Sequence, residues 1–181
     1  MATALALGVG LGAGVAQGAE VSIPSSPGTL TYTGAAGVNG VVVSLNGSGD
    51  YEFASAGGEL ITLDPSNDAT LCTGGGTDTV TCAPGLVSAL SVSLGDGDDT
   101  LTLASYADPV TFTGGGATDR LVAAAVAAGT IDLDDGAVTL SGQAADPVLS
   151  GVEEVSLTGT GGADVFDVAG RAVRTVRAHF P

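Results

Sequence analysis

Carboxylates and glycines gathered in one short segment are the residues best suited to chemistry in this chain. The sequence LGDGDDTLT contains Asp96, Asp98 and Asp99, with Gly95 and Gly97 before and between them. Glycine allows the positive φ angles of a tight turn and brings backbone carbonyls close to a common centre. Calcium takes about six to eight oxygen ligands and accepts both carboxylate and carbonyl oxygens. This segment therefore predicts a calcium-binding turn.

The same residue pattern recurs along the chain: small residues or Gly, then Asp, then any residue, then an apolar one. The segments are TGGGTDTVT (73–81), LGDGDDTLT (94–102), GGGATDRLV (114–122) and GTGGADVFD (159–167). Their Asp residues, Asp78, Asp99, Asp119 and Asp164, are 21, 20 and 45 residues apart. A period near 20 residues is typical of solenoids, in which each repeat packs on its neighbours. The sequence therefore predicts an all-β fold, a parallel β-helix or β-roll-like solenoid with a more irregular β N-terminal part.

The four segments resemble the hemolysin-type calcium-binding (RTX) nonapeptide, G-G-x-G-x-D-x-U-x, in which U is a large apolar residue. Each segment departs from it at one fixed position. In that family an ion lies between stacked turns, so the resemblance implies that Asp78, Asp99 and Asp119 line one edge and bind calcium between them. The family usually runs nonapeptides back to back, whereas one motif per period implies sites on one edge only. The alternative is a metal-free β-helix with Gly-Asp turns.

Carried over residue by residue, the resemblance gives a set of calcium ligands. They are Asp78, Gly95, Asp96, Gly97, Asp98, Asp99, Asp119 and Asp164. Asp164 has no motif-bearing neighbour one period away. The second residue after each motif Asp is apolar and should point into the core. These core residues are Val80, Leu101, Leu121 and Phe166.

The charge balance limits the possible partners. Twenty acidic residues face four basic ones, giving a formal net charge of −16, and Lys is absent. Nucleic-acid binding needs clustered Lys and Arg, and anionic membranes repel such a surface. Asp outnumbers Glu by 15 to 5, and Asp favours turns and ligates metal. A solvated acidic surface explains the charge alone; the turn Asp residues favour calcium ions as partners, with a cell-surface or extracellular polymer as a further candidate.

The first residues indicate export. Residues 1–18 carry no charge, are rich in Ala, Leu, Val and Gly, and end in the small-residue sequence AQG. This is typical of a secretory signal peptide cleaved before Ala19, although no Lys or Arg follows Met1. The stretch is short and rich in Gly for a transmembrane helix. We therefore expect a secreted or cell-surface protein with no stable membrane insertion.

The remaining chain is divided by composition. Residues 19–28 are rich in Ser, Pro and Gly and predict a linker, and 29–71 predict N-terminal β strands. Residues 72–170 hold the RTX-like repeats, in which 121–128 is the one helix-permissive stretch. Residues 171–181 hold three of the four Arg and the only His. They form either a basic tail on the acidic body or a truncated or frameshifted end.

Cys72 and Cys82 are the only cysteines, and they bracket the first repeat. In an exported protein they can pair and close a short loop. With a single His in the chain they do not form a usual structural zinc site. Without a C-x-x-C motif, a redox role is not indicated.

The sequence favours a calcium-stabilised structural or surface-interaction role over two alternative functions. Polysaccharide lyases and epimerases on β-helices need basic or Tyr side chains beside their carboxylates. Before residue 171 the chain offers Arg120 and three Tyr in no recognisable arrangement, so we predict no catalysis. The second rival is a metal-free adhesin or surface-recognition domain with a flat Thr ladder. Thr-x-Thr pairs at 79/81 and 100/102 suggest one, but Arg120 and Val122 interrupt it.

Overall fold

The computed structural model describes residues 18–23, 27–65, 71–125, 130–134, 137–143, 146–167 and 175–179. Apart from Gly18, the predicted signal peptide lies outside these residues. The described part contains β strands and one 3₁₀ turn, Pro84–Leu86, and no α-helix. Within it, no helix is long and apolar enough to span a membrane.

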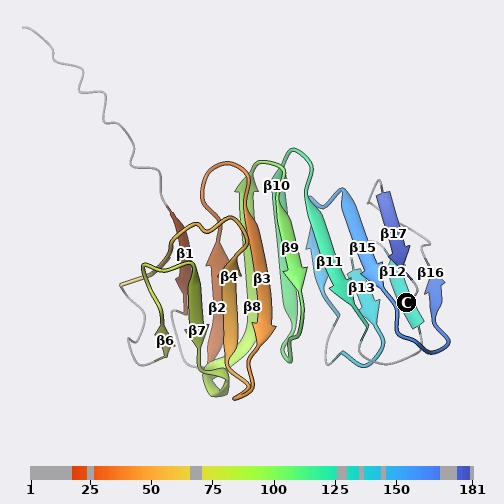
Figure 1. Ribbon diagram of the computed structural model, residues 1–181, viewed down its shortest axis with the longest axis horizontal. Coiled ribbons are helices and arrows are strands. Elements are labelled where there is room, and N and C mark those ends of the chain that lie inside the picture. The colour runs from red at the N-terminus through yellow and green to blue at the C-terminus, as the bar shows by residue number, and fades with distance from the viewer. Residues whose placement is uncertain are drawn as a thin grey trace, which may run out of the picture.

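The strands form two sheets that lie one in front of the other (Figure 1). The nine-stranded sheet has the order β16 (Val165–Asp167), β12 (Thr130–Asp134), β13 (Ala137–Leu140), β14 (Val148–Ser150), β10 (Val110–Gly116), β8 (Val87–Asp96), β2 (Gly28–Thr33), β1 (Ala19–Ser22) and β5 (Ile61–Leu63). The eight-stranded sheet has the order β17 (Thr175–His179), β15 (Glu154–Thr158), β11 (Arg120–Ala124), β9 (Thr100–Leu103), β3 (Gly40–Leu45), β4 (Tyr51–Ser55), β7 (Thr79–Cys82) and β6 (Cys72–Thr73).

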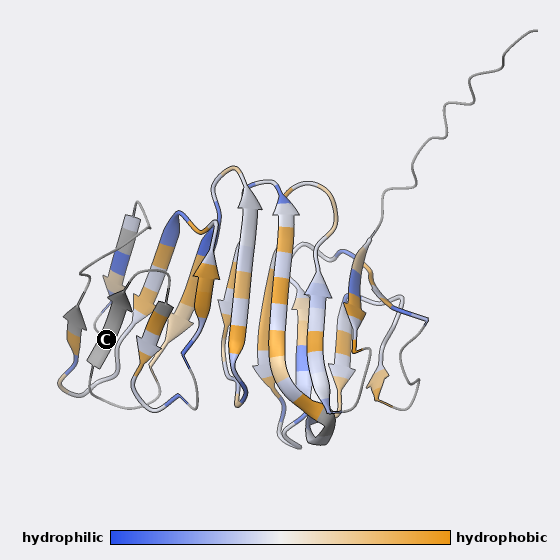
Figure 2. Ribbon diagram, turned by 180° about the vertical axis from the view of Figure 1, so that it is seen from behind, coloured by the Kyte–Doolittle hydropathy of each residue, from blue (hydrophilic) through white to orange (hydrophobic). Residues whose placement is uncertain are grey.

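Alternation of apolar and polar residues along the strands builds the core between the sheets. Figure 2 shows this alternation as orange and pale bands on the strands. The predicted core residues Val80, Leu101 and Leu121 are completely buried, whereas the side chain of Phe166 lies outside the description. Tyr32 and Phe53, from opposite sheets, stack with ring centroids 5.7 Å apart. Such period-2 patterning is why these short segments form strands with one buried face.

The prediction of a β-solenoid was wrong. Parallel pairing with a 20-residue offset does occur, and Leu101 lies beside Leu121. The sheets are nevertheless mixed, because hairpins reverse the chain at both ends: β3 pairs with β4, and β12 with β13, in antiparallel fashion. The offset between parallel partners also changes, since β9 lies between β11 and the much earlier strand β3. The 20-residue spacing of the motifs does not predict these hairpins, because their strands lie between the repeats in the sheets.

The helix-permissive stretch 121–128, for which no helix was predicted, begins within strand β11, and its alternate residues Leu121 and Ala123 pack into the core. Two further segments differ from their expected structure. The expected linker 19–28 contains β1, which pairs with β2 and β5. The expected basic tail contains β17, which pairs with β15 over five residues. The expected β strands within 29–71 are present and include β3 and β4.

A disulfide joins Cys72 and Cys82, which lie directly opposite each other in the β6–β7 hairpin. The sequence left this pairing open, and the structure contains it. Disulfides persist in oxidising compartments. The bond indicates an oxidising, non-cytosolic location for the protein.

Candidate metal centre at the acidic turns

Four polar residues stand side by side immediately before four paired strands of the eight-stranded sheet. Strands β3, β9, β11 and β15 are in register, with Gly40 beside Thr100, Thr100 beside Arg120, and Arg120 beside Glu154. The residues just before these positions form a row that we call the polar stack. Its members are Asn39, Asp99, Asp119 and Glu153.

A repeated hydrogen bond connects the polar stack. Asn39 N–H donates to Asp99 Oδ1 at 2.6 Å, and Asp99 N–H donates to Asp119 Oδ1 at 3.1 Å. Asp119 N–H donates to Glu153 Oε2 at 2.9 Å. Each side chain therefore satisfies the main-chain donor of the preceding member, which fixes how the turns stack on one another.

The two central carboxylates are buried, and each has an oxygen without a hydrogen bond. Asp99 is 1% exposed and Asp119 is 0% exposed, and within the described residues Oδ2 of each finds no partner. Burial raises the pKa of Asp119, and the charges of Asp99, Glu153 and Asp98 raise it further, while the Asp99 N–H opposes them. An orphaned, buried carboxylate oxygen is costly unless a proton or a cation accompanies it.

Asn39 shows how an amide fits the same position. Its Nδ2 donates to the carbonyl oxygens of Ala35, Gly37 and Leu94, at 2.8, 2.6 and 3.2 Å. A carboxylate cannot donate in this way. The unpartnered oxygens of Asp99 and Asp119 are the consequence.

Two exposed carboxylates extend from one acidic turn to the next. Asp98 Oδ1 accepts a 2.9 Å hydrogen bond from Thr118 N–H. Asp96 Oδ1 lies beside Gly116, 3.0 Å from where a Cβ on that glycine would stand. Gly97 has φ +137, and a Cβ there would lie 2.5 Å from the Gly37 carbonyl oxygen. Glycine at this position therefore allows the turns to approach closely.

The structure brings some of the predicted ligands together and leaves others apart. Gly95 and Asp96 end strand β8, Gly97, Asp98 and Asp99 connect it to β9, and Asp119 immediately precedes the neighbouring strand β11.

Two predicted ligands lie elsewhere. Asp78 is exposed before β7, which β4 and β3 separate from β9. Asp164 precedes β16 of the other sheet, where its Oδ2 accepts from Thr160 N–H at 2.7 Å. The expected row of Asp78, Asp99 and Asp119 is therefore reduced to the last two.

Sequence reasoning missed Asn39 and Glu153. Neither lies in a nonapeptide: Asn39 is 60 residues before Asp99, three times the 20-residue period, and Glu153 is 34 residues after Asp119, which is not a multiple of it. The signal that could have found them is weaker: each is a polar residue shortly after a glycine and before an alternating apolar strand.

The donors suit a hard cation such as calcium only in part. Carboxylate and carbonyl oxygens are the right ligands, and the orphaned oxygens of Asp99 and Asp119 lack a partner. Within the described ranges, however, no three His, Cys, Asp or Glu side chains are gathered closely enough to hold a metal ion. The exposed side chains of Asp96 and Asp98 would have to turn toward Asp99 to complete a ligand set.

Comparison of the chain with protein-family models, with curated proteins and with solved structures found no match. Function is therefore inferred from the residues and their geometry.

Proposed function

We propose that the chain is an exported, calcium-binding β protein with a structural or surface-interaction role, in which calcium stabilises the fold at the acidic turns. One observation carries the proposal: the buried carboxylates of Asp99 and Asp119 each keep an unpartnered oxygen beside a turn that presents Asp96 and Asp98. The resemblance to RTX nonapeptides supports the same ion. Asp99 and Asp119 would be the inner ligands, and Asp96 and Asp98 the outer ones.

The charge of the chain gives calcium a role in stability. A formal net charge of −16 opposes a compact state through self-repulsion. Extracellular modules bind calcium with dissociation constants on the order of 10⁻⁴–10⁻³ M. A tenfold excess over that constant adds roughly 1.4 kcal/mol for each site. This is a useful fraction of a typical stability of about 5–15 kcal/mol.

The location and partners follow from the same features. The predicted signal peptide and the disulfide support secretion or display at the cell surface. An extracellular or cell-surface polymer is the proposed partner, since the scarcity of Lys and Arg argues against nucleic acid. No catalytic role is assigned to the chain.

A second candidate function is a metal-free surface-recognition or adhesive domain. Asn39 favours it, because this member of the polar stack fills its position by hydrogen bonding alone. If Asp119, whose pKa is raised by burial, carries a proton, it can donate in the same way without an ion. The polar stack would then be a structural ladder.

Thermal unfolding with and without calcium tests the proposal. We expect millimolar calcium to raise the melting temperature of the processed protein and a chelator to reverse the rise. The double variant Asp96→Asn, Asp98→Asn should lose most of the response. Asp78→Asn, a change of the same kind at an exposed motif Asp outside the polar stack, should keep it. Identical melting curves in calcium and in chelator would overturn the proposal and favour the metal-free function.

A further inference from the structure

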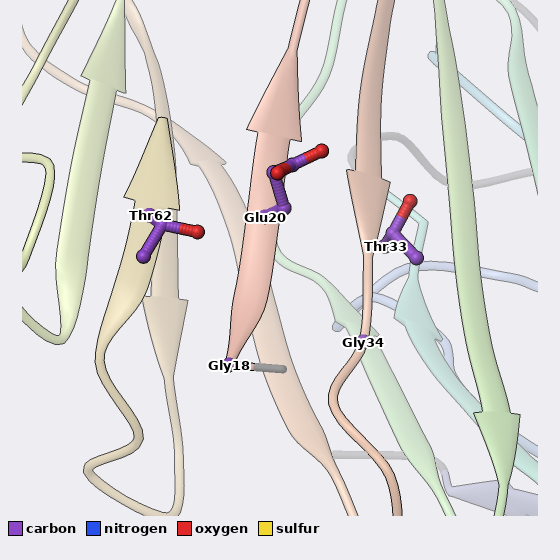
Figure 3. Close-up of a pocket in the computed structure, with 5 residues that line it drawn as sticks. All are labelled: Gly18, Glu20, Thr33, Gly34 and Thr62. Atoms are coloured by element: carbon purple, nitrogen blue, oxygen red, sulfur yellow. The ribbon is translucent and has the colours of Figure 1, made fainter. Parts of the chain in front are cut away.

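A hollow of about 300 Å³ opens on the face of the nine-stranded sheet that points away from the core. It is lined by Gly18, Glu20, Thr33, Gly34 and Thr62, from the side-by-side strands β1, β2 and β5 and their ends (Figure 3). Glu20 pairs with Thr33 on one side and with Thr62 on the other. The hollow therefore presents one carboxylate between two hydroxyl groups.

The Glu20 carboxylate forms no hydrogen bond or ion pair with the part of the chain that the structure describes. Strands β1, β2 and β5 carry no Lys, Arg or His. The Thr62 hydroxyl donates to the carbonyl oxygen of Ala19 at 3.0 Å, so it can still accept a hydrogen bond. These acceptors suit a group that is cationic and has several donors.

Ala19 supplies such a group if the chain is processed where the sequence predicts. It is the first residue of β1 and is fully buried, whereas Gly18 before it is exposed. Gly18 lies at the hollow and close to the Leu60 carbonyl oxygen, 3.1 Å from where a Cβ would stand. Hydrolysis of the Gly18–Ala19 peptide bond by a leader peptidase consumes one water molecule. It leaves a carboxylate on Gly18 and an α-ammonium group on Ala19.

We propose that this hollow is the binding site for the α-ammonium group of Ala19, and that Glu20 is its counter-ion. The inference rests on the export part of the proposed function, and not on calcium. An ammonium group has three donors. The Glu20 carboxylate and the Thr62 hydroxyl line the hollow, and the Leu60 carbonyl oxygen adjoins Gly18, so these are its proposed acceptors. Because Ala19 is buried in the folded chain, cleavage precedes folding, and the new terminus then locks β1 between β2 and β5.

The Glu20 carboxylate is the group that favours the charged form of the amine. A nearby carboxylate raises the pKa of an amine, whereas burial lowers it. We expect the charge of Glu20 to outweigh the burial of Ala19. A raised amine pKa adds stability that is fully present below the unfolded pKa and is lost as the pH rises through the folded pKa.

The absence of Lys makes the test direct, because Ala19 then carries the only primary amine of the processed protein. The protein is purified from the medium of an exporting host, and its mass and first residue are determined. Reductive dimethylation with isotope-labelled formaldehyde keeps the positive charge and gives one NMR signal, whose pH titration reports the pKa. Acetylation adds comparable bulk but removes the charge.

Glu20→Gln is the test variant and Glu52→Gln is its matched control. Glu52 also lies between two hydroxyl residues, Ser44 and Thr81, but on the other sheet. We expect a protein that begins at Ala19, with an amine pKa that falls in Glu20→Gln and not in Glu52→Gln. Acetylation should lower the melting temperature of the wild type more than that of Glu20→Gln.

Two results would overturn the inference: a first residue other than Ala19, or an amine pKa that is the same in the wild type and in Glu20→Gln. Its failure is distinguishable from failure of the calcium proposal. Glu20 is not a proposed calcium ligand, so the calcium response of Glu20→Gln should equal that of the wild type. An amine pKa that Glu20→Gln does not change, together with an intact calcium response, defeats this inference alone.

Discussion

Asn39 and Asp99 occupy equivalent positions on neighbouring strands, and the main-chain N–H of Asn39 donates a 2.6 Å hydrogen bond to Asp99 Oδ1. The side-chain amide of Asn39 donates to backbone carbonyl oxygens, including that of Leu94. In contrast, Asp99 Oδ2 is buried and has no hydrogen-bond partner among the described residues. The pair therefore places a neutral and an ionisable side chain of similar shape at the same register position before neighbouring strands. The amide of Asn39 suits a ladder of hydrogen bonds, whereas the carboxylate of Asp99 also suits a metal site.

Asp99→Asn should stabilise the protein without calcium and lose that advantage with calcium. In chelator, we expect the free energy of unfolding to rise by about 1–3 kcal/mol, because a buried, unpartnered oxygen becomes a donor like that of Asn39. In millimolar calcium the advantage should disappear, since the ion loses a charged ligand. Urea unfolding in the two buffers measures both values. A variant that is equally stabilised in calcium and in chelator would mean that Asp99 serves only the ladder.

The two predicted ligands Asp99 and Asp164 should differ in their effect on calcium binding. Asp99 adjoins Asp119 in the polar stack, whereas Asp164 lies in the other sheet and bonds to Thr160 in its own turn. We expect Asp99→Ala to abolish more of the calcium-dependent rise in melting temperature than Asp164→Ala does. Calorimetric melts of both variants with and without calcium provide the comparison. The reverse order would show that the ion binds elsewhere.

The strands could be predicted from the sequence because alternation is a local signal. VVVSL and YEFAS each place every second residue in the core, and their bounds follow from the flanking turn residues. The pairing of those strands is not local. Asn46, whose Oδ1 accepts from Ser48 and Asp50 N–H, closes the hairpin that turns β4 back on β3. Nothing in a 20-residue spacing specifies that reversal.

The sequence predicted the candidate site only where the 20-residue spacing of the motifs matches the pairing of the strands. Asp99 and Asp119 are 20 residues apart and lie on adjacent strands. Asp78 has the same motif and a similar spacing, yet β3 and β4 come between it and Asp99. Asn39 takes the position that the spacing assigned to Asp78. Long-range pairing of β3 with β9 decided this, and single-sequence patterns do not encode such pairing strongly.

Removing the disulfide should destabilise the hairpin that covers one end of the molecule. Cys72 and Cys82 close a loop with a sequence separation of 10, for which the chain-entropy account gives about 3 kcal/mol. The double variant Cys72→Ser, Cys82→Ser should lose roughly this free energy of unfolding in urea titrations. Reducing agent should lower the stability of the wild type toward that of the variant and leave the variant unchanged. Equal stability of the oxidised wild type and the variant would contradict the prediction.

Alkaline pH should unfold the protein through its buried tyrosines. The pKa of Tyr51 is raised to about 12, chiefly by burial and also by Asp108, to which its hydroxyl donates at 2.8 Å, while the Ala107 and Asp108 N–H groups that donate to the same oxygen oppose the rise. The pKa of Tyr32 is likewise raised to about 12, chiefly by burial and also by the charges of Glu59 and Asp99.

The sign of the effect follows from the raised pKa values. The folded state holds the phenolic proton more tightly than the unfolded state, whose pKa is about 10. The resulting stability is complete below about pH 10 and is lost as the pH rises through about 12. Each of Tyr32 and Tyr51 then costs roughly 2–3 kcal/mol, a large share of a typical stability of about 5–15 kcal/mol.

Ultraviolet absorbance of tyrosinate and circular dichroism, recorded together from neutral to strongly alkaline pH, test this account. Ionisation and loss of strand signal should occur in one cooperative step. Tyr32→Phe should move the step to higher pH, because it removes one of the titrating groups and leaves the Phe53 stacking in place. Tyr51→Phe should instead lower stability at neutral pH, since the N–H groups of Ala107 and Asp108 lose their acceptor. Tyrosines that ionise near pH 10 while the strand signal persists would contradict their burial.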